Sequence, residues 1–439
     1  MRVEQVAYPV LRRIAKYPRL TRTLFRCSGY ESPFDPEYSV DPYPGLERLR
    51  RTQSGPVYYH RLFRQWFVIG YDETVALMSS PSCSVADTGE ILLSVRPYTK
   101  LSAQARRNFS RWLLIVDPPD HTRLRRLVSR AFTPRALAAY EPRLRVIADE
   151  LLEAMVRENN TEVVTGFTAP LPIYVIAELL GLPRERWEWL RASSDDIIGL
   201  TDPLHDFDPV VVNRRFAELD EYFSDLIDQR RAEPRDDLIS VLARACDDGD
   251  TLDDDELVAM IGFLMLAGHE TTTALLGNSI VALAAHPEQR TLLRARRDLV
   301  ENAVEELIRF DTSVQSGART AEADIELGGT TIPAGARIVI LWGAANRDPR
   351  RWPDADELRL DRTDPRPISF GHGIHHCVGA ALARMEMRVA LPAFLDTFGD
   401  YRLDDTAARW NRSLALRGPL TLRLDPVEFG SKARPAPRR

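Results

Sequence analysis

The 439-residue chain is poor in lysine and cysteine and has no long hydrophobic run. Arginine supplies nearly all of its positive charge, since lysine occurs only at Lys16, Lys100 and Lys432. The four cysteines are far apart, without the spacing of a disulfide framework, and no secretory signal opens the chain, so we expect a reducing, cytoplasmic compartment. The longest apolar run, Leu257 to Ala267, is shorter than the ~20 residues that a membrane-spanning helix needs, which predicts no transmembrane anchor.

The composition is that of an ordinary globular protein, with 44% hydrophobic and 28% charged residues. The net charge is −6 and both signs are interspersed, which argues against nucleic acid as a partner. Length alone suggests two or three domains, but no repeat or linker divides the chain. We therefore expect one domain over residues 35–425, between a basic extension (1–34) and a disordered, proline-rich tail (426–439), and we expect the protein to be a monomer.

The most informative segment runs from Ser369 to Gly379 and places Cys377 at the end of a glycine-rich turn, directly before an apolar helical pattern. Gly371, Gly373 and Gly379 permit the close backbone whose N–H groups hold a thiolate charge, as in a haem-iron ligand. A helix beginning at the cysteine would add its positive N-terminal end. A lone cysteine is more often a small buried hydrophobe. Zinc is disfavoured, because His372, His375, His376 and Cys377 are too crowded to surround one tetrahedral ion.

The pattern Phe-Gly-x-Gly-x-His-x-Cys-x-Gly, followed by Leu-Ala-Arg-x-Glu, spans Phe370 to Glu386 and resembles the haem-binding loop of the cytochrome P-450 superfamily. Segments such as Asp41-Pro42-Tyr43-Pro44 are similar to the start of its bacterial members, so the resemblance covers about Asp35 to Leu424. It implies haem b with Cys377 as the axial thiolate. It also implies a mainly α fold with small β-sheets, with haem between a long distal helix and the helix after the cysteine loop.

A long apolar helical pattern, Asp253 to Ala285, is interrupted by the sequence from Ala267 to Thr272. Glycine inside a helix costs ~1 kcal/mol, and buried Glu270 and Thr271 need partners. A threonine often only bonds back to a carbonyl one turn earlier. The segment resembles the superfamily's acid-alcohol pair. This resemblance implies that Glu270 relays protons and that Thr271 steadies oxygen. It also implies that Ala267 and Gly268 let oxygen and haem approach the helix, and that the helix opens locally. His269 points elsewhere on the helix, so we expect no direct role for it.

Other motifs that resemble the superfamily supply further expected site residues. His121 and Arg125 share a helix face, and on their own they would suggest a solvated basic stripe. The resemblance implies that these two residues, together with Arg319 and His375, bind the haem propionates. Glu306 and Arg309, on a predicted helix from Leu299 to Phe310, match the Glu-x-x-Arg motif and are expected to be structural. Because Glu357 stands where relatives often have arginine, the third partner stays open between Arg347 and Arg359. Ser313 replaces a common proline.

Outside these motifs the chain reads as amphipathic helices with marginal strands at Val57–Tyr59, Trp66–Ile69, Ile325–Leu327 and Arg337–Leu341. We expect apolar pocket walls from Val85 to Asn108, from residues 170–215, from Phe263 to Ala267 and from Ser313 to Ala318, which favours a hydrophobic small-molecule substrate.

Because one haem domain fills the chain, electrons must come from a separate protein; the resemblance implies a ferredoxin and a ferredoxin reductase that uses NADH or NADPH. Five arginines are candidates for a basic docking patch: Arg123, Arg126, Arg130, Arg384 and Arg388. The leading function is an oxygen-dependent monooxygenase that hydroxylates or epoxidises its substrate. A peroxide-driven or non-oxygenating haem-thiolate enzyme and a haem-dependent gas sensor are the alternatives.

Overall fold

The structure is a computed structural model, and it describes residues 38, 40–61, 63–85, 98–201, 207–244, 246–247, 250–404, 406–411, 413 and 415–425. The basic extension expected over residues 1–34 and the tail expected over 426–439 lie outside the described residues. The predicted domain limits therefore stay predictions.

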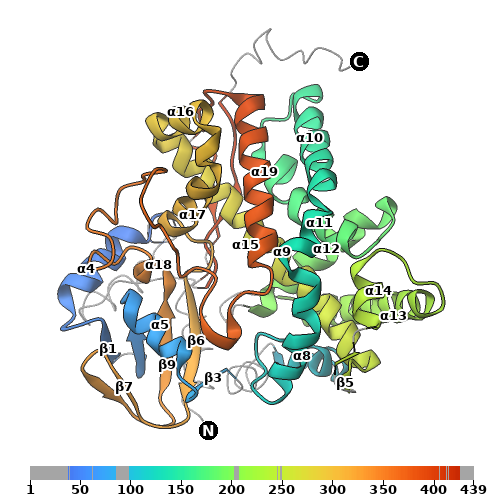
Figure 1. Ribbon diagram of the computed structural model, residues 1–439, viewed down its shortest axis with the longest axis horizontal. Helices are drawn as coiled ribbons and strands as arrows, with labels where there is room; N and C mark the ends of the chain where they lie inside the picture. The colour runs from blue at the N-terminus through green and yellow to red at the C-terminus, as the bar shows by residue number, and fades with distance from the viewer. Residues whose placement is uncertain are drawn as a thin grey trace.

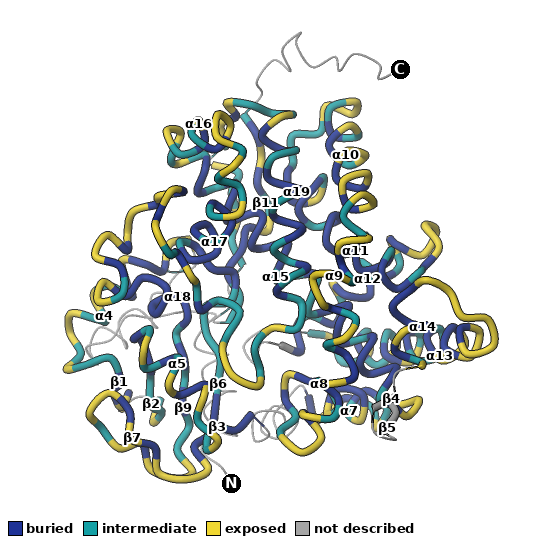
Figure 2. Tube along the Cα trace, in the orientation of Figure 1, coloured by how far each residue is buried: buried dark blue, intermediate teal, exposed yellow. Residues whose placement is uncertain are grey.

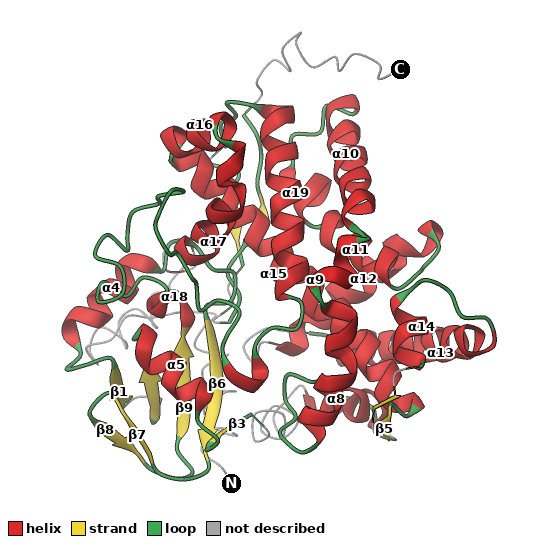
Figure 3. Cartoon of the chain, in the orientation of Figure 1, coloured by secondary structure: helices red, strands yellow, loops and turns green. Residues whose placement is uncertain are grey.

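Helices make up most of the molecule, and most of the strands gather at one side of it (Figure 3). The mainly α class with small β-sheets is confirmed. The α-helices are α4 (Tyr43–Thr52), α5 (Tyr71–Ser79), α7 (Ala103–Ser110), α8 (Asp120–Ser129), α9 (Pro134–Ala138), α10 (Glu141–Arg157), α11 (Pro170–Leu179), α12 (Trp187–Ile197), α13 (Pro209–Ala232), α14 (Leu238–Ala243), α15 (Asp254–Ala285), α16 (Pro287–Ala295), α17 (Val300–Phe310), α18 (Trp342–Ala345) and α19 (Ala380–Phe398).

The largest sheet has five strands in the order β1-β2-β9-β6-β3, with β2 and β9 parallel and the other pairs antiparallel. All four predicted strands are present, within about one residue of their expected ends. Strand β6 was not predicted, because its small and polar residues carry little strand propensity and are held by pairing with β9. The strands are β1 (Val57–His60), β2 (Gln65–Val68), β3 (Cys83–Ser84), β4 (Cys246–Asp247), β5 (Asp250–Thr251), β6 (Ser316–Ala321), β7 (Ile325–Leu327), β8 (Thr330–Ile332), β9 (Arg337–Leu341), β10 (Arg409–Trp410) and β11 (Pro419–Thr421).

Helix α15 crosses the centre of the molecule, where most of its trace is buried (Figure 2). It begins with a reciprocal cap: the Glu256 N–H donates to Asp253 Oδ1 (2.7 Å) and the Asp253 N–H donates to Glu256 Oε2 (3.1 Å). Among the described residues it is the one helix long and apolar enough to cross a membrane, but 72% of its most apolar window is buried inside the protein. It is therefore packed as a core helix.

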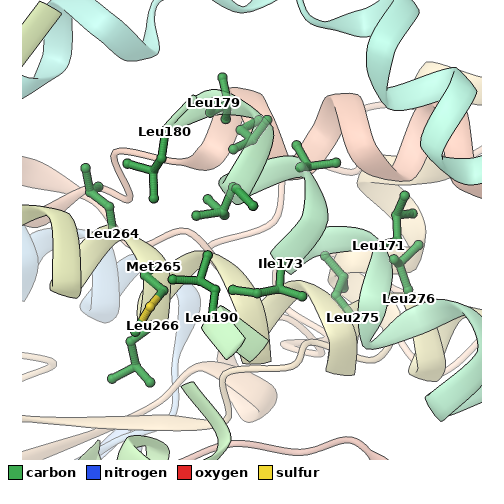
Figure 4. Packing of buried hydrophobic residues seen from close by; sticks show 14 of the residues in the cluster. Leu171, Ile173, Leu179, Leu180, Leu190, Leu264, Met265, Leu266, Leu275 and Leu276 are labelled. Carbon is green, nitrogen blue, oxygen red and sulfur yellow. The ribbon is translucent and has the colours of Figure 1, made fainter. Parts of the chain in front are cut away.

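The core around α15 is built from leucine and isoleucine side chains of α11 and α12. Figure 4 shows Leu171 and Ile173 of α11 and Leu190 of α12 facing the apolar side chains of α15. Each fully buried side chain of this kind contributes roughly 1.5–3 kcal/mol, so the packing fixes the position of α15.

Helix α19 lies beside α10 and in contact with α15 and α17 (Figure 1). It begins at Ala380, three residues after the predicted start at Cys377, with Gly379 as its N-cap residue. Before it, the chain runs past α5 through a short 3-10 turn, Gly373–His375. This arrangement holds the cysteine loop against the interior, below α15.

Candidate functional site

A cavity of 1110 Å³ lies between α15, the cysteine loop and the large sheet, and its walls are mainly apolar. Each predicted wall segment contributes to it, for example through Val85, Ile176, Phe263 and Val314. Other wall residues come from segments without a motif and were not predicted: Met78, Phe109, Trp112, Leu113, Trp342 and Leu416. A cavity of this size accommodates a large cofactor together with a small molecule.

Cys377 opens into this cavity. Its backbone N–H donates to the Phe370 carbonyl (2.8 Å), which closes the loop behind the thiol. Burial raises the pKa of the Cys377 thiol, whereas the Gly379 N–H and the guanidinium groups of Arg125 and Arg384 act to lower it. The loop therefore supplies donors to a thiolate, but a cation bound to the sulfur is needed to offset burial fully.

Two glycines of the loop have backbone conformations that favour glycine, with φ +71° at Gly371 and +69° at Gly373. A β-carbon at Gly373 would lie 2.2 Å from the carbonyl oxygen of Met78, at the end of α5. The close approach that requires Gly373 is therefore to α5, not to the sulfur as the sequence suggested. At Gly379 a β-carbon would meet Cys377 Sγ at an ordinary 3.9 Å.

The four residues predicted to hold propionates all line this cavity. His121 and His375 have ring centroids 4.1 Å apart, and Arg125 and Arg319 line the same cavity. Neither ring nitrogen of buried His121 has a hydrogen-bond partner among the described residues, whereas His375 Nε2 lies 3.5 Å from Asp117 Oδ1. Burial lowers the pKa of His121, and burial together with His121 and Arg319 lowers that of His375 to about 4.

Such a cluster of unsatisfied nitrogens and two guanidinium groups fits an anionic group with several oxygen acceptors. Cys377 offers a soft sulfur ligand in the same cavity, whose walls are mainly apolar. A group that combines a metal ion, a large apolar ring and peripheral carboxylates matches both the sulfur ligand and the cluster of histidine and arginine side chains. The residues present therefore fit haem.

Helix α15 forms another wall, to which Ala267, Gly268 and Thr271 contribute. The expected local opening is not present: α15 is continuous from Asp254 to Ala285. The Thr271 hydroxyl donates to the Ala267 carbonyl (2.8 Å), so the side chain follows the back-bonding alternative and leaves the helical ladder intact. At Gly268 a β-carbon would lie 2.8 Å from Ile176 Cδ1, so packing against α11 also requires a small residue there.

Glu270 does not belong to the described residues that line the cavity; it lies on the side of α15 where Asp195 of α12 is close. Burial, with Asp195 as a second cause, raises the pKa of Glu270 to about 7. His269 is buried, with Nδ1 2.9 Å from Ser194 Oγ and Nε2 3.2 Å from the Ala169 carbonyl oxygen. As expected, His269 does not line the cavity.

Glu306 and Arg309 form a completely buried ion pair, with Arg309 Nε 2.7 Å from Glu306 Oε2. The third partner is Arg362, whose Nε lies 3.0 Å from Glu306 Oε1. The two candidates from the sequence were wrong as side-chain partners: Arg359 reaches Glu306 only through its backbone N–H (3.0 Å), and the Arg347 guanidinium donates to the Phe310 carbonyl. The turn between residues 359 and 362, which brings Arg362 inward, has no signal in the sequence.

The predicted basic patch is partly neutralised. Arg123 pairs with Glu256 and Arg384 with Glu305. Arg126 and Arg130 are exposed, and Arg388 borders a hollow of 510 Å³ that reaches Cys377 from the side of α19.

Comparison with known proteins agrees with this geometry. Residues 199–399 match the cytochrome P-450 family. Cytochrome P-450 monooxygenase PikC of Streptomyces venezuelae is 37% identical over 391 residues, which cover 87% of this chain and 90% of PikC. 6-Deoxyerythronolide B hydroxylase of Saccharopolyspora erythraea is 37% identical over 402 residues, with coverage of 88% and 97%. The crystal structure of CalO2 superimposes with a TM-score of 0.84 at 31% identity, over 91% of this chain and all of CalO2 (100%).

The two relatives and CalO2 match 87–91% of this chain and 90–100% of their own length. The chain also has a cysteine loop, a central helix and a cavity whose chemistry fits haem. The chain therefore belongs to the cytochrome P-450 family and is a cytochrome P-450 monooxygenase.

Proposed function

We propose that this enzyme hydroxylates or epoxidises a hydrophobic small molecule with O2 and two electrons from a ferredoxin chain. The observation that carries the proposal is one apolar cavity that contains both Cys377 and Thr271 in its walls. We further propose that residues 35–425 act as a single haem domain, in the cytoplasm and as a monomer.

Haem, when bound in this cavity, would supply an iron centre for the activation of O2, and Cys377 would hold it through its thiolate. Cys377 provides the thiolate, held by the Gly379 N–H and by the positive charges of Arg125 and Arg384. His121, Arg125, Arg319 and His375 bind the carboxylates at the edge of the ring. The unpaired ring nitrogens of His121 support this role, since a carboxylate there accepts a hydrogen bond from the ring N–H.

In the wall formed by α15, the Thr271 hydroxyl would orient a water molecule or another proton donor, while the small residues Ala267 and Gly268 would leave room for O2. To do so, Thr271 would give up its hydrogen bond to the Ala267 carbonyl, which contributes about 1 kcal/mol. Glu270 delivers protons. A carboxyl group with a pKa of about 7 is suited to both giving and taking a proton at neutral pH.

The substrate binds above this wall, where aromatic and aliphatic side chains such as Phe263, Trp112 and Ile198 exclude water. The name of the Saccharopolyspora erythraea relative states that it hydroxylates 6-deoxyerythronolide B.

Electrons arrive from a ferredoxin, reduced by NADH or NADPH through its reductase, at the hollow beside α19. Exposed Arg126 and Arg130 of α8 and the adjoining turn attract an acidic partner. Charge reversal at both positions is expected to slow haem reduction by ferredoxin severalfold at low salt. Arg157→Glu is the matched control, because Arg157 is also exposed but lies at the far end of α10. Equal rates in all three proteins would contradict this docking site.

The proposed activity is tested with haem-loaded enzyme, a ferredoxin, its reductase, NADPH and a panel of hydrophobic compounds under 18O2. A product that carries one 18O atom supports the proposal. Product formation with hydrogen peroxide alone would replace it by the peroxide-driven alternative. Tight haem binding with no product under either condition would favour the gas sensor.

A further inference from the structure

A cluster of polar side chains lies where α12 packs against α15, outside the cavity. Carboxylate oxygens of Asp195 and Glu270 and a ring nitrogen of His269 all lie within 4.8 Å of one another. Asp195 is the outermost member, with 44% of its side chain exposed. Glu270 is mostly buried, one residue before Thr271 in the cavity wall. The cluster therefore extends from solvent to the wall of the site.

A metal ion is one interpretation of such a cluster, but the hydrogen bonds of His269 oppose it. The Ala169 carbonyl can only accept, so His269 Nε2 carries the proton, and Nδ1 accepts from the Ser194 hydroxyl. Both ring nitrogens are thus engaged. Burial lowers the pKa of His269 to about 4, so the ring is neutral near pH 7 and does not carry the proton itself.

We propose that Asp195 and Glu270 act as a carboxyl pair that shares one proton and passes it from solvent to the active site, with Asp195 as the entry residue. This inference deepens the proposed function and rests on it. In the step, the O–H bond of protonated Asp195 breaks as an O–H bond forms on Glu270; Asp195 then takes a proton from solvent. No electrons are transferred.

The separation of the two carboxylates supports this exchange. Their oxygens lie within 4.8 Å of each other, a gap that one water molecule or a side-chain rotation of exposed Asp195 bridges. Two carboxylates at this distance oppose each other's ionisation, so the pair retains a proton at a pH where an isolated carboxyl group has lost it.

The surrounding charges hold Asp195 in place without neutralising Glu270. On α12, Arg191 lies 3.1 Å from Asp195 and 2.9 Å from Glu188, and Asp196 pairs with Arg215 of α13 (2.7 Å). The other neighbours are engaged elsewhere: on α11, Tyr174 bonds to Glu188, and Glu178 pairs with Arg143. Among the described residues, no cation is recorded as a partner of Glu270.

The first test is a titration that does not depend on turnover. The carboxylic C=O stretch of Glu270, identified by its loss in Glu270→Gln, is followed against pH by infrared difference spectroscopy of the haem-loaded protein. In Asp195→Asn the titration midpoint of Glu270 is expected to fall by half a unit or more. Asp196→Asn is the matched control, since it removes the same charge from the next position. An unchanged midpoint in Asp195→Asn would overturn the pairing.

The second test measures coupling, the fraction of NADPH oxidised that yields product, together with hydrogen peroxide. Asp195→Asn is expected to lower coupling at least threefold and to increase the solvent isotope effect. Asp195→Glu should restore both quantities to the wild-type values, and Asp196→Asn should match the wild type in both. Equal coupling in Asp195→Asn and the wild type would refute the relay. If the wild type itself lacks the thiolate spectrum or any 18O-labelled product, the proposed function fails, whereas the titration still decides the pairing.

Discussion

Replacing Arg362 by alanine tests whether the buried triad of Glu306, Arg309 and Arg362 stabilises the fold. The Arg362 guanidinium donates to Glu306 Oε1 (3.0 Å) and to the carbonyls of Asp354 (2.7 Å) and Glu357 (2.9 Å). A hydrogen bond to a charged group contributes about 1.5–3 kcal/mol, and a neutral one about 1 kcal/mol. Glu306 keeps Arg309, so its charge is not left alone. The expected loss in the free energy of unfolding is therefore about 3–5 kcal/mol.

Arg359→Ala is the matched control, because the Arg359 side chain is exposed and its one recorded ion pair, to Asp354, is 3.4 Å long. Its contact with Glu306 uses the backbone N–H, which alanine retains. This variant should lose less than about 1 kcal/mol. Urea unfolding of the haem-loaded proteins, followed by tryptophan fluorescence, compares the two. Equal stability of the two variants would refute Arg362 as the third member of the triad.

Three further predictions concern the site. In urea unfolding, Gly373→Ala should lower the free energy of unfolding by at least ~2 kcal/mol more than Gly335→Ala does. Both glycines have positive φ, but only at Gly373 would a β-carbon lie against a backbone oxygen. Thr271→Val should reduce product formed per NADPH and increase hydrogen peroxide; unchanged coupling would contradict the role of the hydroxyl. For Glu270, the pKa of about 7 exceeds the ordinary 4.5, so the folded state binds the proton more tightly and stability falls as pH rises from 4.5 through 7, by ~3 kcal/mol. Glu270→Gln should remove this fall, as urea unfolding at several pH values will show.

The parts of the fold that could be predicted from the sequence are those with strong local signals. The pattern from Asp253 to Ala285 predicted α15 within one residue, because a long apolar stretch with an acidic cap has few alternatives. The glycine-rich turn located Cys377 at the cavity for a similar reason. By contrast, β6 has little strand propensity of its own and exists because β9 and β3 pair with it.

Side-chain directions within the site could not be predicted in the same way. The sequence placed Glu270 and Thr271 side by side, but one residue along a helix turns a side chain by about 100°. Thr271 therefore reaches the cavity while Glu270 faces α12, and only the packing of α12 on α15 brings Asp195 to it. Arg362 likewise depends on a distant turn. Contacts between remote segments carry no local pattern from which to infer them.

The most direct test of the central claim is the visible spectrum of the purified enzyme, reduced with dithionite and bound to carbon monoxide, beside that of Cys377→Ala. The wild type should show the strongly red-shifted Soret band of a thiolate-ligated haem, and the variant should lack it. A band at the position of ordinary histidine-ligated haem in the wild type, or the same band in both proteins, would contradict Cys377 as the axial ligand.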